Sequence, residues 1–249
     1  MNWIEEKQKL SREIVELLYK YNMIDTWYKS KSEGWTLFSD LWSPIYINLR
    51  LVGGYPNVLK KIGHALARLI EEECKDASLI VGIASAGVPI ATAISVEGGI
   101  PMAYTRKLEG VKNLNDFQEK LSSYGQHNLV EGNIRDSENI ILIDDLVTSL
   151  GSKLIAREQV LFEASRRNVT ITCDNIVVIL DREQGAEKLA KEKGLSLFSL
   201  IRFTSDGIHW LKDKFSDVEY EVISDYLNNT DKYQDKKIQS EVKKMCQAR

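Results

Sequence analysis

Apolar residues recur along this chain in two patterns that predict alternating strands and helices. Short, largely apolar runs, such as LIVGI at 79–83 and IILI at 140–143, are typical of strands buried on both faces of a parallel sheet. Between these runs, apolar residues return every three or four positions, which predicts amphipathic helices. The expected strands are 45–49, 79–83, 102–105, 140–143, 171–180 and 195–201, and the expected helices are 3–22, 56–74, 90–96, 153–161, 186–193, 208–215 and 218–227. This order predicts an α/β fold.

The segment NIILIDDLVTSLGS at 139–152 combines the features of a sugar-phosphate site. A buried strand leads to Asp144 and Asp145, and a polar turn follows at 148–152. A turn that leads into a helix presents unpaired backbone N–H groups and the positive end of the helix dipole, so it suits a phosphate. Carboxylates instead accept hydrogen bonds from sugar hydroxyls or hold the water shell of magnesium. The simpler alternative is that the acidic pair only caps a strand-to-helix junction.

Three further segments end predicted strands with residues suited to ligands. ASAGVP at 84–89 is a small-residue turn that lets the backbone approach an anion, although any βα unit can contain a tight turn. Arg106 and Lys107 suit a pyrophosphate, or lie on an ordinary solvated turn. Arg182 suits a carboxylate, unless it forms a surface ion pair with Glu183. Ligands of open α/β sheets bind at this carboxyl edge of the strands.

Composition describes an ordinary folded protein and excludes several classes. The chain has 249 residues, 43% hydrophobic and 28% charged, which suits one domain with appendages. Its net charge of −3 argues against a general nucleic-acid binder. The 3 widely spaced cysteines indicate reduced thiols of a cytoplasmic protein rather than a zinc site or a disulfide framework. We expect neither a membrane span nor a signal peptide, because the N-terminus is acidic and amphipathic.

The segment at 139–152 resembles the phosphoribosyl pyrophosphate (PRPP) signature of type I phosphoribosyltransferases. Other segments resemble the orotate phosphoribosyltransferases in particular, in that family's order. They are SPIYINLR at 43–50, VGIASAGVPIATAIS at 81–95, the Arg106-Lys107 pair, YGQHNLVEG at 124–132 and VVILDREQG at 177–185. The resemblance implies the type I phosphoribosyltransferase fold, in which a central, mostly parallel sheet is flanked by helices and joined by a hood region and a long mobile loop.

The resemblance also implies how the chain is divided. Residues 1–34 would form an N-terminal helix and linker, and residues 35–203 the phosphoribosyltransferase domain, with the mobile loop at 108–132. Residues 204–249 would add helices and a charged tail, which we expect to be a solvated helix or a frayed end.

In the resembling family, two acids bind the ribose, a turn cradles the 5-phosphate, and other loops bind pyrophosphate and orotate. The matching PRPP-binding residues are Asp144, Asp145, Thr148, Ser149, Leu150, Gly151, Ser152, Arg106, Lys107, Ser85 and Ala86. The matching orotate-binding residues are Thr148, Phe38 and Arg182, with Arg182 on the carboxylate. The implied cofactor is Mg²⁺, held by PRPP and water near the acidic pair. A homodimer with the loop acting in trans is also implied, and a decarboxylase is a candidate partner.

Two departures from the family pattern lie in the predicted binding site. Phe38 stands where the family has a ligand-binding lysine, and it would offer an apolar or stacking face to the base. Leu150 stands where the family usually has glycine. We therefore expect either a shifted register that uses Gly151 or a weaker phosphate cradle.

A third departure lies in the mobile loop, which is longer than the family's. Ser122 stands where the family has an essential lysine. Lys112 or Lys120 is expected to substitute for it, and His127 corresponds to the histidine region of the family's loop.

The main functional prediction is transfer of a phosphoribosyl group from PRPP to orotate, giving orotidine 5′-phosphate and pyrophosphate in pyrimidine (UMP) biosynthesis. Two alternatives stay open. One keeps this chemistry with a different base, since Phe38 replaces a cation near the base. The other is a regulatory homologue that binds PRPP or a nucleotide with weakened turnover, as the changes at Ser122 and Leu150 would permit.

Overall fold

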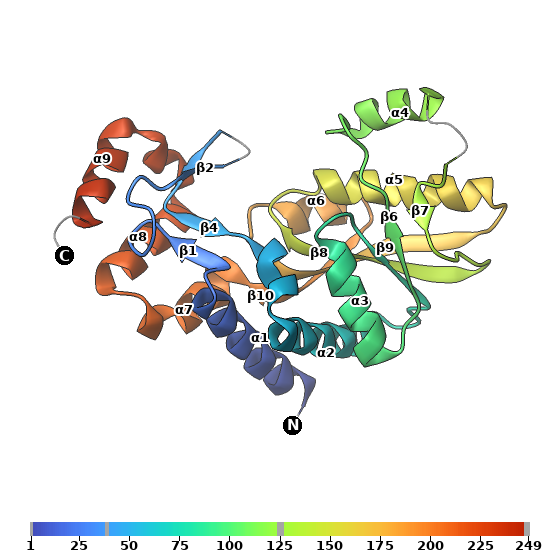
Figure 1. Cartoon of the computed structure of the whole chain (residues 1–249), viewed down its shortest axis with the longest axis horizontal. Coiled ribbons are helices and arrows are strands. Elements are labelled where there is room, and N and C mark those ends of the chain that lie inside the picture. Colours follow the sequence, from blue (N-terminus) through green and yellow to red (C-terminus); the bar gives the residue numbers. More distant parts are fainter. Residues whose placement is uncertain (1, 38–39, 124–126, 247–249) are drawn as a thin grey trace.

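A six-stranded sheet organises the computed structural model (Figure 1), which describes residues 2–37, 40–123 and 127–246. The strand order is β10-β9-β8-β5-β6-β7, and all neighbours are parallel except β6 and β7. The strands are β5 (Leu79–Gly82), β6 (Met102–Thr105), β7 (Val130–Glu131), β8 (Glu138–Val147), β9 (Ile171–Asp181) and β10 (Ser196–Arg202). The predicted α/β class with a mostly parallel sheet is confirmed.

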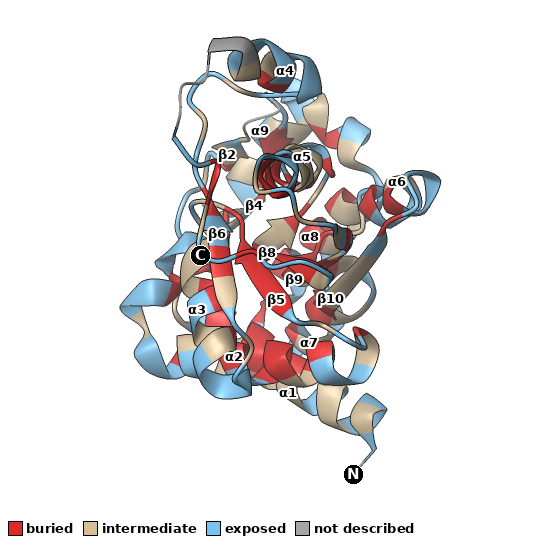
Figure 2. Ribbon diagram, turned by 90° about the vertical axis from the view of Figure 1, so that its right-hand side faces the viewer, coloured by how far each residue is buried: buried red, intermediate tan, exposed pale blue. Residues whose placement is uncertain are grey.

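Alternate residues of the central strands face two separate hydrophobic cores. In β8, Ile141 and Ile143 belong to one core and Ile140 and Leu142 to the other, because successive side chains of a strand point to opposite faces. Helices α1 (Trp3–Lys20), α2 (Pro56–Glu73) and α3 (Gly87–Gly98) cover the first face. Helices α5 (Gly151–Arg166) and α6 (Ala186–Glu192) cover the second. Figure 2 shows these buried layers on either side of the sheet.

A smaller unit, here called the hood, combines the two ends of the chain. Its strands form two antiparallel pairs, β1 (Ile24–Thr26) with β4 (Ile45–Ile47) and β2 (Trp35–Thr36) with β3 (Trp42–Ser43). Its helices are α8 (Asp217–Asn228) and α9 (Lys236–Met245). The blue strands and the red helices lie side by side in Figure 1.

The C-terminal helix α9 packs on the hood strands. The indole Nε1 of Trp27 donates to the carbonyl oxygen of Val242 at 3.0 Å, and both residues are buried. The side chain of Gln234 bonds to the backbone N–H and carbonyl of Trp42, at 2.8 and 3.2 Å. The expected solvated helix is present at Lys236–Met245, where Val242 is the only buried residue, and its docking on the hood shows that it is not a frayed end. Its partners lie far away in the sequence, so local patterning does not indicate them.

Two other segments differ from their expected form. Strand β8 does not end before the acidic pair but continues through it to Val147, because Asp144 pairs with Val178 of β9. The loop at 108–132 contains helix α4 (Leu114–Ser123), which packs on α5 with Phe117 buried.

The remaining elements are η1 (Leu49–Gly54), η2 (Phe203–Gly207), α7 (Ile208–Trp210), η3 (Lys212–Lys214) and η4 (Thr230–Gln234). Within the described chain, no helix combines the length and apolar character that a membrane span requires.

Candidate functional site

The connection between β8 and α5 has the geometry of an anion cradle. It consists of Thr148, Ser149 and Leu150, and α5 begins directly after it. The first backbone N–H groups of a helix have no acceptor within the helix, and the helix dipole adds positive potential there. Ser149 and Ser152 are exposed at this helix start. The hydroxyl and N–H donors expected at 148–152 therefore lie together.

Leu150 fits this turn by burying its side chain. It has φ of −84° and ψ of −4° at the N-cap position of α5, and its side chain lies in the second core. Among the described residues, neither Leu150 nor Gly151 has a positive φ. The expected shift of register to Gly151 was therefore wrong, because the core accommodates a side chain here while the backbone stays right-handed. The alternative of a weaker cradle stays a prediction.

The two acids at the end of β8 have different surroundings. Asp144 is buried, and its Oδ2 lies 2.9 Å from Nζ of Lys153. Its Oδ1 accepts the backbone N–H of Asp145 at 2.9 Å. Asp145 is less buried and accepts the backbone N–H of Leu146 at 2.7 Å. Burial, and next the charge of Asp144, raise the pKa of Asp145 to about 6. Asp144 is held in an ion pair, whereas Asp145 titrates in the mildly acidic range.

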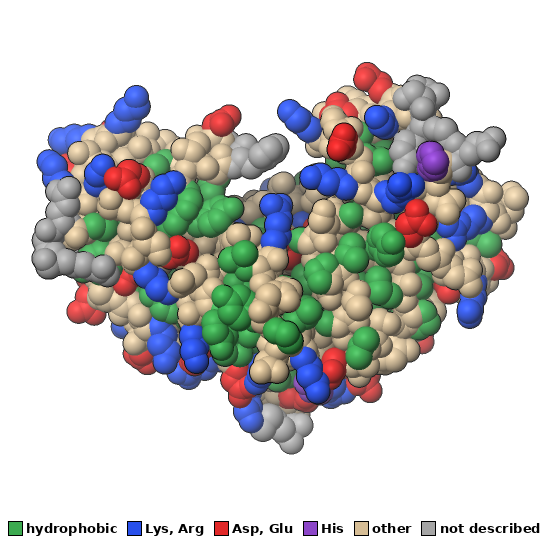
Figure 3. All heavy atoms as spheres, viewed as in Figure 1, with side chains coloured by type: hydrophobic (Ala, Val, Ile, Leu, Met, Phe, Trp, Pro, Cys, Tyr) green, Lys and Arg blue, Asp and Glu red, His purple; other side chains and the backbone are tan. Residues whose placement is uncertain are grey.

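A cavity of about 430 Å³ brings together the predicted ribose- and phosphate-binding segments. It lies between the hood, the loop after β5 and the start of α5, and Figure 3 shows a hollow between the hood and the lobe that carries α4 and α5. The expected residues that line it are Asp144, Asp145, Thr148, Ser149, Ser152, Ser85 and Ala86. Segments that are far apart in the sequence thus meet at one site.

The loop after β5 is held close to β8 and β6. The backbone N–H of Ala84 donates to Oγ1 of Thr105 at 3.0 Å, which ties the loop to the end of β6. A Cβ atom on Gly87 would lie 2.1 Å from the carbonyl oxygen of Ile143, so only glycine fits where α3 starts against β8. The small-residue run therefore brings this backbone next to the strand that carries the acidic pair.

The expected loop cations lie outside this cavity. Arg106 and Lys107 are exposed at the start of the long loop, and the described lining includes neither. Lys112, Lys120 and His127 are also exposed and absent from that lining. The structure assembles the ribose and phosphate groups without the cations expected for pyrophosphate.

Two residues at which the chain departs from the family pattern fall where the structure is not described. Phe38 lies outside the described residues, and so does the side chain of Ser122. Their expected roles stay predictions.

Arg182 follows β9 and has a buried guanidinium group. Its backbone N–H donates to the carbonyl of Val147 at 3.0 Å, next to the phosphate turn, and its carbonyl accepts from Thr204. Arg182 is 8% exposed, and its Nε and Nη2 have no hydrogen-bond partner in the described chain. Glu183 pairs with Arg202 at 3.0 Å instead. Arg182 is not part of the described cavity lining. A buried cation without a partner is costly, which suits a group that binds an anionic ligand.

Helix α5 also holds both ends of the long loop. Nε2 of Gln159 donates to the carbonyl of Arg106 at 2.9 Å, and Oε2 of Glu163 accepts the backbone N–H of Leu129 at 2.9 Å. Arg167, which follows the helix, donates to the carbonyl groups of Gly132 and Val130, at the end of the loop, at 2.8 and 3.0 Å. The helix that begins at the phosphate turn therefore fixes where the loop leaves and rejoins the sheet.

The cavity includes residues to which the sequence analysis assigned no role. Tyr46 lines it from β4 of the hood, Asn48 and Arg50 line it from the start of η1, and Lys153 lines it from α5. Tyr46 stacks on Trp35 with ring centroids 5.7 Å apart and an interplanar angle of 16°. A cation directly after a predicted strand or a predicted phosphate turn was the available signal for Arg50 and Lys153.

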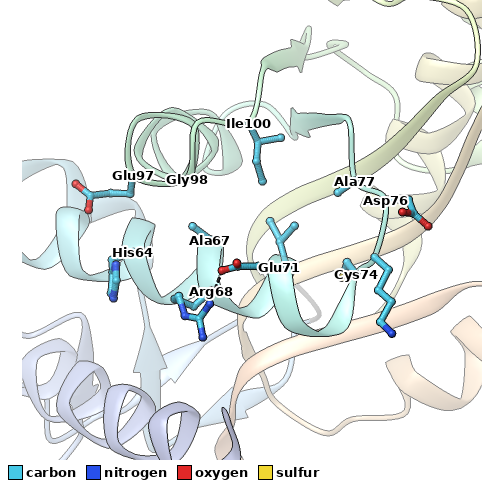
Figure 4. Close-up of a pocket in the computed structure, with 12 residues that line it drawn as sticks. His64, Ala67, Arg68, Glu71, Cys74, Asp76, Ala77, Glu97, Gly98 and Ile100 are labelled. Carbon is cyan, nitrogen blue, oxygen red and sulfur yellow. Dashed lines mark hydrogen bonds and ion pairs between the residues drawn. The ribbon is translucent and has the colours of Figure 1, made fainter. Parts of the chain in front are cut away.

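A second cleft, of about 530 Å³, lies between α2 and the connection that follows α3 (Figure 4). Its charged lining residues include Arg68, which is paired with Glu6, Glu71 and Glu72. None of the predicted site residues lines this cleft. It is therefore a weaker candidate than the cavity at the end of β8.

The described residues contain no group of three His, Cys, Asp or Glu side chains arranged to hold a metal ion. The acidic pair nevertheless supplies the oxygen donors that magnesium prefers. Because Asp144 is already paired with Lys153, Asp145 is the carboxylate that fits the water shell of a magnesium ion. These donors suit a metal held mainly by its substrate.

No family model matches the chain, but the known proteins similar to it include orotate phosphoribosyltransferases. The orotate phosphoribosyltransferase of Thermococcus gammatolerans is 32% identical over 160 residues, which are 64% of this chain and 75% of that protein. The UMP synthase of Leishmania donovani has a TM-score of 0.69 at 22% identity, covering 88% of this chain and 42% of that one. The orotate phosphoribosyltransferase of Mycobacterium tuberculosis, solved with PRPP, has a TM-score of 0.52 at 19% identity, covering 77% and 88%. The two solved structures share the fold of this chain.

Proposed function

The chain belongs to the orotate phosphoribosyltransferase family, and we propose that its cavity transfers a phosphoribosyl group from PRPP to orotate. The products are orotidine 5′-phosphate and pyrophosphate, in a step of pyrimidine biosynthesis. The bond between C1 of the ribose and pyrophosphate breaks, and a ring nitrogen of the base forms the new bond to C1. The chain is thus a pentosyltransferase that needs no protein nucleophile.

One observation carries this proposal: the phosphate turn, the acidic pair and the loop after β5 line the same cavity. The turn at 148–152 supplies N–H and hydroxyl donors for the 5-phosphate. Asp144 and Asp145 supply acceptors for the ribose hydroxyls. The backbone around Ser85 and Ala86 offers a close approach to the pyrophosphate.

Arg182 and an aromatic pair support orotate as the acceptor. A guanidinium group binds a carboxylate through two parallel hydrogen bonds, and Arg182 has buried nitrogen atoms without partners in the described chain. Tyr46, stacked on Trp35, lines the cavity that contains the phosphate turn and offers a flat face to a planar base. Thr148, the first residue of the phosphate turn, lines the same cavity as Tyr46.

Magnesium is the proposed cofactor. When bound, it neutralises charge on the leaving pyrophosphate. Asp145 is the residue best placed to hold its water shell, since Lys153 occupies Asp144.

A homodimer in which the long loop acts in trans is part of the proposal. In the described part of the chain, no cation of the long loop lines the cavity of the same subunit. In addition, α2 and α3 leave an apolar groove of about 650 Å³ lined by Pro56, Leu59 and Val96, and Val96 is 77% exposed. A second copy would cover this groove. Val96→Glu is expected to shift a dimer to monomer in analytical ultracentrifugation and to reduce turnover.

Two further parts of the proposal concern the setting of the reaction. We place it in the cytoplasm, which the buried thiols of Cys74 and Cys173 support. We also propose a decarboxylase partner that consumes orotidine 5′-phosphate, which the structural similarity to a UMP synthase supports.

A direct assay tests the proposed activity. Purified protein is mixed with magnesium, PRPP and orotate, and the loss of orotate absorbance is followed. Turnover supports the proposal. Release of pyrophosphate only with another base would favour a different acceptor, and saturable PRPP binding without turnover would favour a regulatory homologue.

A further inference from the structure

Lys153 occupies an unfavourable place for a lysine. It lies in the first turn of α5, where the helix dipole is positive, and its side chain is only 5% exposed. Removing an ammonium group from water is costly unless it is paired. Its Nζ lies 2.9 Å from Oδ2 of Asp144 and donates to the carbonyl of Leu146 at 2.7 Å. This cation lines the proposed substrate cavity, so a role in the site is the natural explanation.

We propose that Lys153 is a positioning residue of the PRPP site, an inference that rests on the function proposed above. Its ammonium group joins the first turn of α5 to the end of β8. The phosphate turn at 148–150 lies between these two anchor points. Lys153 therefore holds the turn in the shape that binds the 5-phosphate and fixes Asp144 in one orientation for the ribose.

The contacts of Asp144 show how completely this carboxylate is fixed. Lys153 holds Oδ2 on one side, and the backbone N–H of Asp145 holds Oδ1 on the other. Each oxygen keeps a second lone pair that can accept a ribose hydroxyl. A carboxylate ordered before the ligand arrives loses less side-chain entropy on binding.

The same ammonium group reduces the negative charge that PRPP meets. Two neighbouring carboxylates face a substrate that carries a phosphate and a pyrophosphate. In the described chain, Lys153 is the only lysine or arginine within ion-pair distance of either acid. Its loss would leave the acidic pair to repel the phosphate groups of the substrate.

Lys153 acts through other groups and does not touch the reacting C1 atom in this account. Interactions with the phosphate and the ribose are present in both the ground state and the transition state. Their loss raises Kd and KM more than it lowers kcat.

Calorimetric titration of the full chain with PRPP and magnesium, without an acceptor base, tests this inference. Lys153→Met removes the ammonium group and keeps most of the side-chain length. We expect Kd for PRPP to rise about 10- to 100-fold, because hydrogen bonds from a charged group are lost. Turnover at saturating PRPP is expected to stay within about threefold of wild type. The matched control is Lys7→Met, which breaks an ion pair of 2.8 Å with Glu73 outside the cavity and should leave Kd unchanged.

A double variant separates positioning from folding. In Lys153→Met, Asp144 keeps a buried charge without its partner, which lowers stability. Lys153→Met/Asp144→Asn removes that charge, so we expect the melting temperature to recover. Its affinity for PRPP should still lie below that of Asp144→Asn alone, because the phosphate turn has lost its anchor in the double variant only.

Three results would overturn the inference. One is recovery of wild-type affinity in the double variant. Another is a Kd for Lys153→Met within about twofold of wild type. If this second result occurs in a protein that turns over orotate, it overturns this inference alone. Wild-type protein that does not bind PRPP would overturn the proposed function as well.

Discussion

The two halves of the cavity are built in opposite ways. The ribose-phosphate half comes from one continuous stretch, β8 with its turn and the start of α5, which lies between two hydrophobic cores. The half assigned to the base comes from Arg182 after β9 and from the hood, where Trp42 contacts Gln234 across 192 positions of sequence. Trp27 contacts Val242 across 215 positions. Local sequence specifies the part that binds the ribose 5-phosphate of PRPP, and long-range packing specifies the part that meets the base.

Because the two halves are built from different parts of the chain, mutations can test PRPP binding and acceptor binding separately. Changes in the continuous stretch should affect PRPP binding and the stability of the sheet together. Changes in the hood or at Arg182 should affect the acceptor and leave PRPP binding nearly intact.

The largest effect is expected from Asp144→Ala, which tests the continuous half. The variant leaves the buried Lys153 without its partner, so the free energy of unfolding should fall by about 3–5 kcal/mol and PRPP binding should be lost. Urea unfolding followed by circular dichroism measures the stability. Lys7→Met is the control, because its ion pair with Glu73 joins side chains that are 27% and 26% exposed and should contribute at most about 1 kcal/mol. An equal loss of unfolding free energy in Asp144→Ala and in the control would contradict the claim that the buried ion pair contributes more to stability.

Arg182→Met tests the acceptor half by itself. Removing the guanidinium group should raise KM for orotate about 100-fold, because a bidentate contact with a carboxylate is lost. The Kd for PRPP should change by less than about threefold. The free energy of unfolding should stay the same or rise, since a buried cation without a partner is removed. Steady-state kinetics give KM for orotate, and calorimetry gives Kd for PRPP. An equal rise in both would show that Arg182 does not act on the acceptor alone.

Asp145→Asn tests, through the pH dependence of stability, whether Asp145 titrates in the mildly acidic range. Burial and Asp144 raise the pKa of Asp145 from 3.8 to about 6 in the folded state. The folded protein therefore binds this proton more tightly, so the stabilisation is present below about pH 4 and is lost as pH rises through about 6. Relative to the variant, the wild type should lose about 2 kcal/mol of unfolding free energy between pH 4 and pH 7. Urea titrations at several pH values measure this difference, and a constant difference would show that Asp145 does not titrate as described.

The smallest effect is expected from Gln234→Ala in the hood. The variant loses two hydrogen bonds to the backbone of Trp42, which should lower the free energy of unfolding by about 1 kcal/mol. KM for orotate should rise by less than about tenfold, and Kd for PRPP should not change. Thermal unfolding and the orotate assay measure these effects. A change in PRPP affinity larger than that in orotate KM would show that the hood does not act mainly on the acceptor.

Features set by neighbouring residues were predictable from the sequence. The apolar run at 140–143 predicted a strand buried on both faces, and its residues do alternate between the two cores. The polar turn before helical spacing predicted the helix start that now lines the cavity. The expected register shift to Gly151 was wrong because a family preference for glycine says nothing of the core beside Leu150, which buries this side chain.

Features set by distant residues were not predictable. The continuation of β8 through Asp144 depends on its pairing with Val178 of β9. The ion pair of Asp144 with Lys153 depends on how α5 folds back on β8. The packing of α9 depends on Trp27, at the other end of the chain. No local pattern of apolar and polar residues contains this information.

The most direct test is a crystal structure of the chain with orotidine 5′-phosphate, which carries the phosphate, the ribose and the base carboxylate in one molecule. The account predicts the phosphate on the N–H groups at the start of α5, the ribose hydroxyls on Asp144 and Asp145, and the carboxylate on Arg182. A phosphate bound away from the turn at 148–152, or Arg182 without contact to the base, would contradict it.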